Sequence, residues 1–183
     1  MMNNRLKPGD AAVDFIYDTP WESKQEFYTS TGKATTVLIF LRYRGCPVCQ
    51  MEMANLKRDI SLFEEKQARV FVILQSSQAT LTASAKQEDW PFTIVCDPEG
   101  DLFQLYGVEA GGIIKYLHPA GLVAAIKATI KGFRHGKFEG RETQLPAVFV
   151  VDPDKTIQWA YYGSTLSDVP APSMIVNSGL SSK

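Results

Sequence analysis

The sequence has little that would place the protein in a membrane or on nucleic acid. The apolar run from Gly121 to Ile130 contains Lys127 and is too short to span a bilayer, which needs about 20 residues. The stretch from Met1 to Pro8 lacks the apolar core of a signal peptide. Nineteen basic and twenty acidic residues leave a net charge of -1, which gives no electrostatic footprint for nucleic acid or an anionic membrane. We therefore expect a cytoplasmic protein that binds neither.

Cysteine is also scarce. Three cysteines in 183 residues are too few for a disulfide scaffold, which agrees with a reducing compartment. The composition, 45% hydrophobic and 21% charged, is that of an ordinary globular chain, and the length fits a single domain over residues 1–183. Within it we treat about 111–144 as a candidate insertion and about 170–183, where Pro170 and Pro172 break the pattern, as a C-terminal tail.

Two of the three cysteines, Cys46 and Cys49, form a Cys-x-x-Cys pair at the junction of two patterns. Before it, Thr35 to Leu41 is apolar after its two threonines and too short for a typical helix, which predicts a strand buried on both faces in a parallel sheet. After it, apolar residues recur at steps of four and three, as on one face of an α-helix. These residues are Cys49, Met53, Leu56, Ile60 and Phe63.

This strand-to-helix junction predicts a redox dithiol. Cys46 falls at the helix start, where unpaired N–H groups and the helix dipole stabilise a thiolate, and Pro47 fits the first turn. Cys49 lies one turn later on the buried face, within reach of Cys46 for a disulfide. We expect Cys46 to titrate below the free-thiol value of about 8.5 and Cys49 at or above it.

Two other interpretations of the pair remain open. A zinc site would need Cys96 and a histidine, His118 or His135, at spacings that match no common zinc module, so we expect no metal and no other cofactor. The pair is alternatively an inactive, buried one. Cys96 itself is most simply a small buried residue, and whether it takes part in redox chemistry stays undecided.

Elsewhere, apolar runs predict strands and helical periodicity predicts helices. The strands are Val13–Tyr17 and Gln25–Tyr28, an N-terminal β-hairpin, and Arg69–Leu74, Phe92–Cys96, Pro146–Asp152 and Ile157–Tyr162. The helices are about 78–88, 102–106 and 122–133, the last with Leu122, Ile126, Ile130 and Phe133 on one face. The strand, helix and strand around the dithiol form a right-handed crossover, and the last two strands an antiparallel hairpin. The fold class is α/β, with a central mixed β-sheet flanked by helices.

Four stretches together resemble a known family. They are Lys7–Asp10 with Asp14-Phe15, Gly45–Cys49, Asp97–Gly100 with Tyr106–Val108, and Pro146–Asp152. Their order and spacing are similar to those of the peroxiredoxin-like group of the thioredoxin fold, which includes the alkyl hydroperoxide reductase C, thiol-specific antioxidant (AhpC/TSA) and redoxin proteins. The resemblance implies that Cys46 attacks the substrate, that Cys49 resolves, and that Pro146 is a cis-proline packed against the dithiol. By this expectation, a trans bond at Pro146, or a Pro146 far from Cys46, would remove the assignment to the thioredoxin fold.

The chain departs from that family's pattern beside the attacking cysteine. Where peroxiredoxins have a proline seven residues and a Thr or Ser three residues before this cysteine, the chain has Ile39 and Tyr43. The hydroxyl that orients the peroxide is therefore missing in its usual form. Arg42 or Arg44 is expected to supply positive charge to the thiolate and the peroxide, the alternative being that they only cover the strand end.

Three functions are compatible with these residues. The first is an antioxidant thiol peroxidase that reduces a hydroperoxide with Cys46 and Cys49 and is re-reduced by a dithiol protein such as a thioredoxin, or by glutathione. The second is a thiol-disulfide oxidoreductase of thioredoxin or glutaredoxin type, whose substrate is a disulfide. The third is a redox-sensing or binding module without turnover. The sequence identifies neither the peroxide nor the reductant, and it leaves open whether the chain forms an oligomer.

Overall fold

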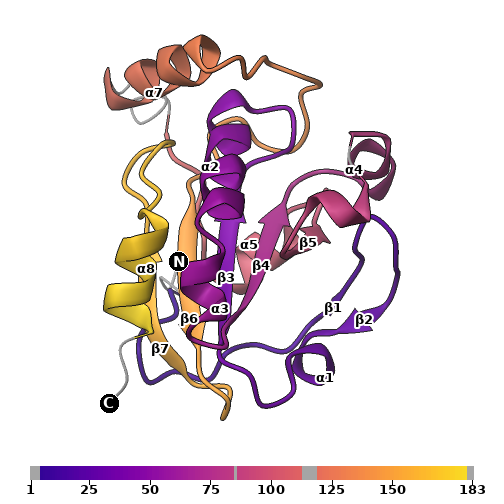
Figure 1. The fold of residues 1–183 in the computed structure, drawn as a ribbon, viewed down its shortest axis with the longest axis vertical. Helices are drawn as coiled ribbons and strands as arrows, with labels where there is room; N and C mark the ends of the chain where they lie inside the picture. Colours follow the sequence, from indigo (N-terminus) through magenta and orange to yellow (C-terminus); the bar gives the residue numbers. More distant parts are fainter. Residues whose placement is uncertain (1–4, 85, 113–118, 181–183) are drawn as a thin grey trace.

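A five-stranded mixed sheet forms the centre of the structure, a computed structural model that describes residues 5–84, 86–112 and 119–180 (Figure 1). The strands lie in the order β5-β4-β3-β6-β7. The first three are parallel, and β6 and β7 run antiparallel to them. Their bounds are β3 (Thr36–Leu41), β4 (Arg69–Leu74), β5 (Thr93–Cys96), β6 (Ala147–Val151) and β7 (Ile157–Tyr162). The predicted thioredoxin-like α/β fold is confirmed.

The side chains of β3 divide between two hydrophobic cores, because successive residues of a strand point to opposite faces. Val37, Ile39 and Leu41 belong to one core, and Leu38 and Phe40 to the other. All six residues of β3 are buried, as its uninterrupted apolar pattern predicts for a central strand.

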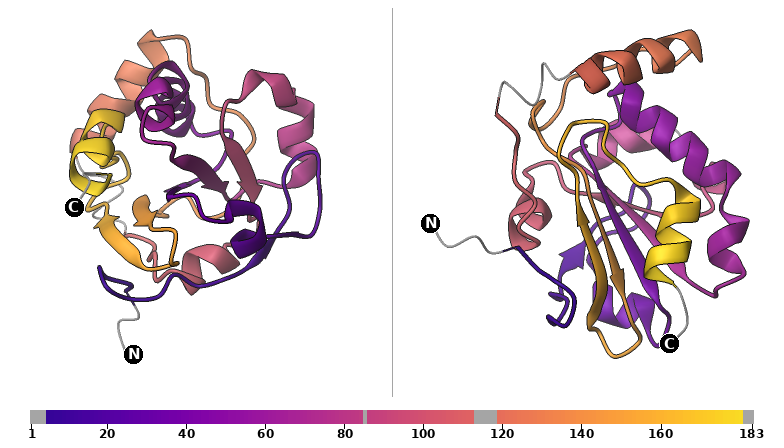
Figure 2. Two further views of the ribbon diagram at one scale, coloured as in Figure 1. Left: turned by 60° about the horizontal axis from the view of Figure 1, so that its bottom comes forward. Right: turned by 90° about the vertical axis from the view of Figure 1, so that its left-hand side faces the viewer.

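Helices cover both faces of the sheet (Figure 2). In the right-hand view of Figure 2, α2 (Pro47–Arg58), α3 (Ser61–Glu64) and α8 (Pro172–Gly179) lie on one side of the sheet. On the other side lies α5 (Asp101–Leu105). The N-terminal segment supplies Phe15, Tyr17 and Phe27 to the core on the α5 side, where the rings of Phe15 and Phe27 stack at 4.6 Å.

Two predicted elements are shorter in the structure. The N-terminal hairpin is present but pairs only β1 (Ile16–Tyr17) with β2 (Gln25–Glu26), because the chain then turns into α1 (Phe27–Thr31). The helix predicted over 78–88 divides into α4 (Gln78–Ser84) and a 3₁₀ turn, Gln87–Asp89.

Helix α7 (Pro119–Ile130) does not bury the apolar face that its periodicity suggested. Leu122, Ile126 and Ile130 are exposed. The helix instead packs against α2, with Ala128 fully buried and its smaller side chains toward the core. At the top of Figure 1, α7 lies across the N-terminal end of α2. None of the helices in the described residues is long and apolar enough to cross a bilayer.

The segment expected as a C-terminal tail holds a helix as far as the structure describes it. Pro172 opens α8 instead of breaking the chain, because the first turn of a helix needs no N–H donor. Ile175 and Val176 are buried in the core that contains Cys46. The end of the predicted tail, 181–183, lies outside the described residues.

This packing predicts a measurable contribution from α8 to stability. Ile175 is 1% exposed, so Ile175→Val should lower the free energy of unfolding by about 0.5–1.5 kcal/mol through the lost methylene and the space it leaves. Met174→Ala, at the neighbouring position that is 51% exposed, should change it by no more than about 0.5 kcal/mol. Urea unfolding of both variants makes the comparison, and equal effects would show that α8 is not docked as described.

Candidate active site

The dithiol lies at the carboxyl end of β3, where the chain turns into α2. Cys46 is the N-cap residue of α2 and Pro47 its first residue, as the sequence predicted. The loop between them and β3, Arg42 to Gly45, is closed by a hydrogen bond from the Cys46 N–H to the Tyr43 carbonyl at 3.2 Å. Cys49 follows one turn later and points into the core.

Both thiols are buried, so exposure does not distinguish them. Cys46 is 1% and Cys49 3% exposed. Donors lie near both sulfurs: the backbone N–H groups of Arg42 and Tyr43 help to lower the pKa of Cys49, and two further donors contact the Cys46 sulfur. The Cys46 Sγ accepts from Arg42 Nη2 at 3.0 Å and from the Cys49 N–H at 3.3 Å. Charge-assisted donors of this kind stabilise a thiolate more than a thiol.

The two thiols titrate as a coupled pair. The pKa of Cys49 is lowered to about 7: burial raises it, but the hydrogen bond with the Cys46 thiol and the charge of Arg42 outweigh burial. The pKa of Cys46 is raised by its hydrogen bond to Cys49, by burial and by the charge on Cys49. This is the reverse of the order expected from the sequence. In such a pair one proton leaves early and the other late, whichever sulfur carries the charge. Arg42 and the Cys49 N–H both donate to the Cys46 sulfur, so these contacts stabilise a thiolate there once the pair has lost its first proton.

Arg42 connects the dithiol to a distant part of the chain. Its Nη1 donates to the Glu142 carbonyl at 3.0 Å and lies 3.9 Å from the Glu142 carboxylate. Burial alone would lower the pKa of Arg42, but the negative charges that form around it, on Cys49 and Cys46 above all, raise it. Arg42 therefore remains a cation in a buried site.

Tyr43 joins two further side chains that the sequence did not bring together. Its hydroxyl is hydrogen-bonded to the Glu142 carboxylate and to His135 Nε2, the latter at 3.1 Å. Burial, followed by the hydrogen bond with Glu142, raises the pKa of Tyr43, so its hydroxyl stays protonated. Glu142 and His135 lie 99 and 92 residues from Tyr43, and no local pattern in the sequence marks Glu142.

These groups open onto one cavity of about 290 Å³. Its polar and reactive lining includes Arg42, Tyr43, Cys46, His135 and Glu142. Its apolar lining includes Val48, Leu122, Ala125 and Leu166. The candidate insertion 111–144 thus contributes walls to the cavity over Cys46. A larger groove of about 710 Å³ lies elsewhere, along Tyr17 and Trp90, but no cysteine lines it, so it holds no reactive thiol.

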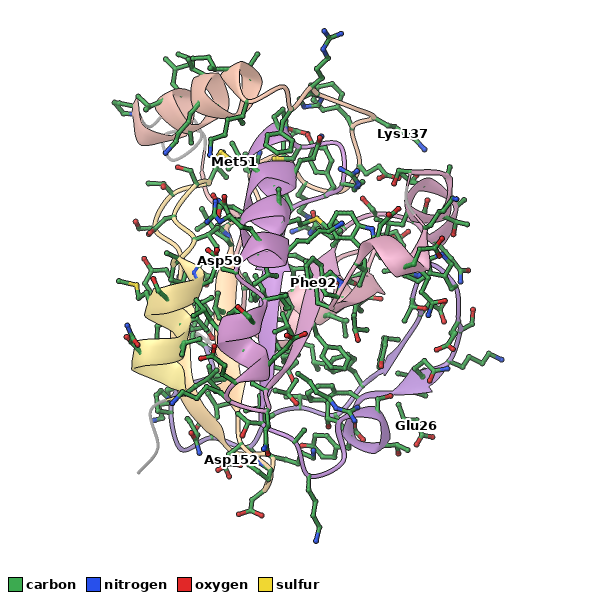
Figure 3. The ribbon with its side chains drawn as sticks, in the orientation of Figure 1. Glu26, Met51, Asp59, Phe92, Lys137 and Asp152 are labelled. Carbon is green, nitrogen blue, oxygen red and sulfur yellow. The ribbon has the colours of Figure 1, made fainter. Side chains whose placement is uncertain are left out.

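The loop after α7 is held against the dithiol turn by its backbone. The Gly136 N–H donates to the Gly45 carbonyl at 2.8 Å, and the Gln50 side chain donates to the Arg134 carbonyl at 2.9 Å. Figure 3 shows Lys137 in this loop, at the same end of the molecule as Met51 in the first half of α2. The loop therefore positions His135 beside Tyr43.

Arg44 and Pro146, two of the predicted site residues, do not line this cavity. Arg44 turns the other way, with its guanidinium 5.9 Å from the Trp90 ring, and burial lowers its pKa. The predicted cis bond at Leu145–Pro146 is wrong, since the bond is trans. Pro146 instead leads straight into β6: its carbonyl accepts from the Gly163 N–H at 2.9 Å and its ring packs over Gly163. The assignment to the thioredoxin fold therefore rests on the strand order and not on the isomer of the Leu145–Pro146 bond.

The remaining cysteine and histidine lie apart from the dithiol. Cys96 ends β5, two strands away from β3, and burial raises its pKa to about 12. His118 lies outside the described residues. Within the described residues, no three His, Cys, Asp or Glu side chains gather in a way that would hold a metal ion.

Comparison with known proteins identifies the family. The sequence profile of the AhpC/TSA family matches residues 8–160, most of the chain. The chain belongs to the AhpC/TSA family. The AhpC/TSA match makes it a peroxiredoxin-like, thiol-dependent oxidoreductase. No curated protein matches the chain in sequence.

Solved structures share the fold of this AhpC/TSA member at low sequence identity. Peroxidoxin BcpB from Mycobacterium tuberculosis superposes with a TM-score of 0.64 at 14% identity, covering 96% of this chain and 95% of its own. AhpC from Enterococcus faecalis gives 0.66 at 15%, covering 94% and 90%. A putative thiol:disulfide interchange protein DsbE from Chlorobium tepidum gives 0.60 at 17%, covering 96% and 99%. At these identities the likeness shows the fold alone.

Proposed function

We propose that the protein reduces hydroperoxides with the Cys46 thiolate as the attacking group. The observation that carries the proposal is the contact of the Cys46 sulfur with the Arg42 guanidinium, 3.0 Å away, in a cavity that Tyr43 also lines. Thiolate attack on a peroxide needs a stabilised sulfur anion and donors at the leaving oxygen. This arrangement supplies both.

The first step transfers one oxygen atom to sulfur. The Cys46 thiolate attacks the terminal peroxide oxygen, the S–O bond forms as the O–O bond breaks, and the products are a sulfenic acid and an alkoxide. Arg42 has five N–H groups, of which its contacts with Cys46 and Glu142 use two, so donors remain for the peroxide. The Tyr43 hydroxyl takes the place of the Thr or Ser hydroxyl that peroxiredoxins have three residues before the attacking cysteine.

Cys49 is proposed to resolve the sulfenic acid. It lies one helical turn from Cys46, with its N–H already hydrogen-bonded to the Cys46 sulfur, so the two can condense to a disulfide with loss of water. The disulfide would then be reduced by an external thiol, either a dithiol protein such as a thioredoxin or glutathione. We place the cycle in the cytoplasm, where three cysteines without a disulfide scaffold are expected.

The test of function uses reduced wild type and Cys49→Ser. After addition of a hydroperoxide, wild type should contain a Cys46–Cys49 disulfide, and Cys49→Ser should stop at a sulfenic acid that dimedone traps on Cys46, because no resolving thiol is adjacent. Intact mass and peptide mapping read both products. A Cys46 oxidation rate no higher than that of a free thiol of similar pKa would overturn the proposal.

The second candidate is a thiol-disulfide oxidoreductase, which would use the same two cysteines through a mixed disulfide. The Cys-x-x-Cys turn and the likeness in fold to the putative DsbE favour it. The burial of Cys46 favours the peroxidase, because a protein disulfide cannot reach a sulfur that is 1% exposed unless the cavity walls move, whereas a small peroxide fits the cavity. Accumulation of a mixed disulfide in Cys49→Ser, without peroxide reactivity, would decide for this candidate.

A further inference from the structure

The hydrogen bonds among Tyr43, His135 and Glu142 need one proton more than these groups carry when each is in its usual form. The His135 Nδ1 lies 2.8 Å from the Gly136 carbonyl oxygen, which only accepts, so Nδ1 carries a hydrogen. In a neutral imidazole Nε2 is then an acceptor and needs the Tyr43 hydrogen. The Glu142 carboxylate needs the same hydrogen, and a hydroxyl has only one.

One extra proton satisfies every contact, in either of two arrangements. In the first, His135 is an imidazolium whose Nε2–H donates to the Tyr43 oxygen, and the Tyr43 hydroxyl donates to the Glu142 carboxylate. In the second, Glu142 is a carboxylic acid that donates to the Tyr43 oxygen, and the Tyr43 hydroxyl donates to Nε2. The two differ only in where the hydrogens lie along one chain of hydrogen bonds, as in a proton relay.

This chain of hydrogen bonds runs from solvent to the cavity that Cys46 lines. His135 is exposed, Tyr43 is fully buried, and both line the cavity with Cys46. The charged groups that face Tyr43 and Glu142 are Arg42 and the Cys46 sulfur. The His135 ring packs on the Phe138 ring, with 4.0 Å between the two ring centroids. Its sequence neighbours Arg134 and Lys137 are exposed, and Lys137 pairs with Glu139 at 3.9 Å.

We infer that His135, Tyr43 and Glu142 form a proton relay that protonates the leaving oxygen of the peroxide. This inference rests on the proposed function. As the Cys46 thiolate takes the terminal oxygen with its hydrogen, sulfur is oxidised to the sulfenic acid and the O–O bond is reduced, leaving an alkoxide. Tyr43 gives its hydroxyl proton to the alkoxide and regains a proton from His135 or Glu142. Overall, the reaction consumes a thiolate, a hydroperoxide and one proton from the relay, and it forms a sulfenic acid and an alcohol.

The relay is tested with two oxidants that differ in their leaving group. tert-Butyl hydroperoxide releases an alkoxide, which needs a proton, whereas peracetic acid releases acetate, which needs none. A general acid is worth about 10²-fold or more for a poor leaving group. Tyr43→Phe should therefore slow Cys46 oxidation by tert-butyl hydroperoxide by about 10²-fold. His135→Gln should slow it by roughly 10-fold, because water can still return a proton to Tyr43, but more slowly than His135 does. With peracetic acid, His135→Gln should stay within about twofold of wild type, and Tyr43→Phe should lose far less than with tert-butyl hydroperoxide, because only its orienting contact is then missing.

Stopped-flow measurement of Cys46 oxidation gives these rates, with Lys137→Gln as the control that removes an exposed positive charge near His135 without touching the relay. Equal slowing with both oxidants, or no slowing with either, would overturn the relay and leave the peroxidase standing. Wild type that reacts with neither oxidant faster than a free thiol would overturn the proposed function and the relay with it. A selective loss with the alkyl hydroperoxide supports both, and the retained peracid rate shows that the variants are folded.

Discussion

Replacing Arg42 by glutamine should slow the oxidation of Cys46 by a hydroperoxide by about 10²–10³-fold, the loss typical for removal of one donor to a developing anion. One guanidinium performs two tasks here. Its Nη2 holds the Cys46 sulfur at 3.0 Å, and its positive charge lowers the pKa at which the dithiol pair releases its first proton. Glutamine keeps a hydrogen-bond donor but loses the charge.

The direction of the pH effect follows from the same contact. The first pKa of the coupled pair is lowered below the free-thiol value, in part by the Arg42 charge, so more thiolate is present near neutral pH than in a free thiol. Without the Arg42 charge that pKa rises, and the thiolate fraction at pH 7 falls. Iodoacetamide alkylation measured against pH should therefore show its midpoint moved to higher pH in Arg42→Gln, and the oxidation rate at pH 7 should fall with it.

Arg44→Gln is the matched control, because it removes the same charge from a residue of the same loop that lies outside the cavity and points toward Trp90. It should leave the alkylation midpoint and the oxidation rate close to those of wild type. If both variants lost activity equally, the loss would come from the loop and not from the contact between Arg42 and the Cys46 sulfur.

The elements that the sequence predicted well are those with a strong local pattern. The buried strand Thr36–Leu41, the helix that starts at Pro47 and the pairing of the final two strands all follow from apolar periodicity and turn residues, and all are present. The Cys-x-x-Cys pair was visible for the same reason, since its chemistry depends on a junction that neighbouring residues define. These are effects of sequence-local contacts.

The parts that the sequence did not predict depend on contacts between distant segments. Glu142 meets Arg42 and Tyr43 across about 100 residues, and nothing around Glu142 distinguishes it from a surface carboxylate. The apolar face of α7 suggested burial, but the small side chains of Ala124 and Ala125 form the contact with the core. The expected cis bond at Pro146 came from the family resemblance, and the residue's actual partner, Gly163, becomes apparent only in the folded chain.

Gly45 is the position at which an added methyl group should disturb the site most. A Cβ at this position would lie 2.2 Å from the Lys137 carbonyl oxygen and 3.0 Å from the Gly136 carbonyl carbon, distances at which backbone atoms must move apart. The hydrogen bond from the Gly136 N–H to the Gly45 carbonyl would be strained or lost. Gly45→Ala should therefore lower the free energy of unfolding by about 1–3 kcal/mol, the usual range for overpacking.

The larger effect should fall on activity. When the backbone of Gly136 and Lys137 moves away, His135 leaves Tyr43 and the cavity over Cys46 opens, and a displacement of about 1 Å in an active site can cost about 10²-fold in rate. Gly112→Ala is the control, because a Cβ there meets nothing within 4 Å. We expect Gly45→Ala to lose about 10²-fold in oxidation by tert-butyl hydroperoxide and to admit bulky maleimides to Cys46 faster than wild type, since opening the cavity exposes the sulfur. Unchanged maleimide access in Gly45→Ala would show that the loop does not cover the dithiol.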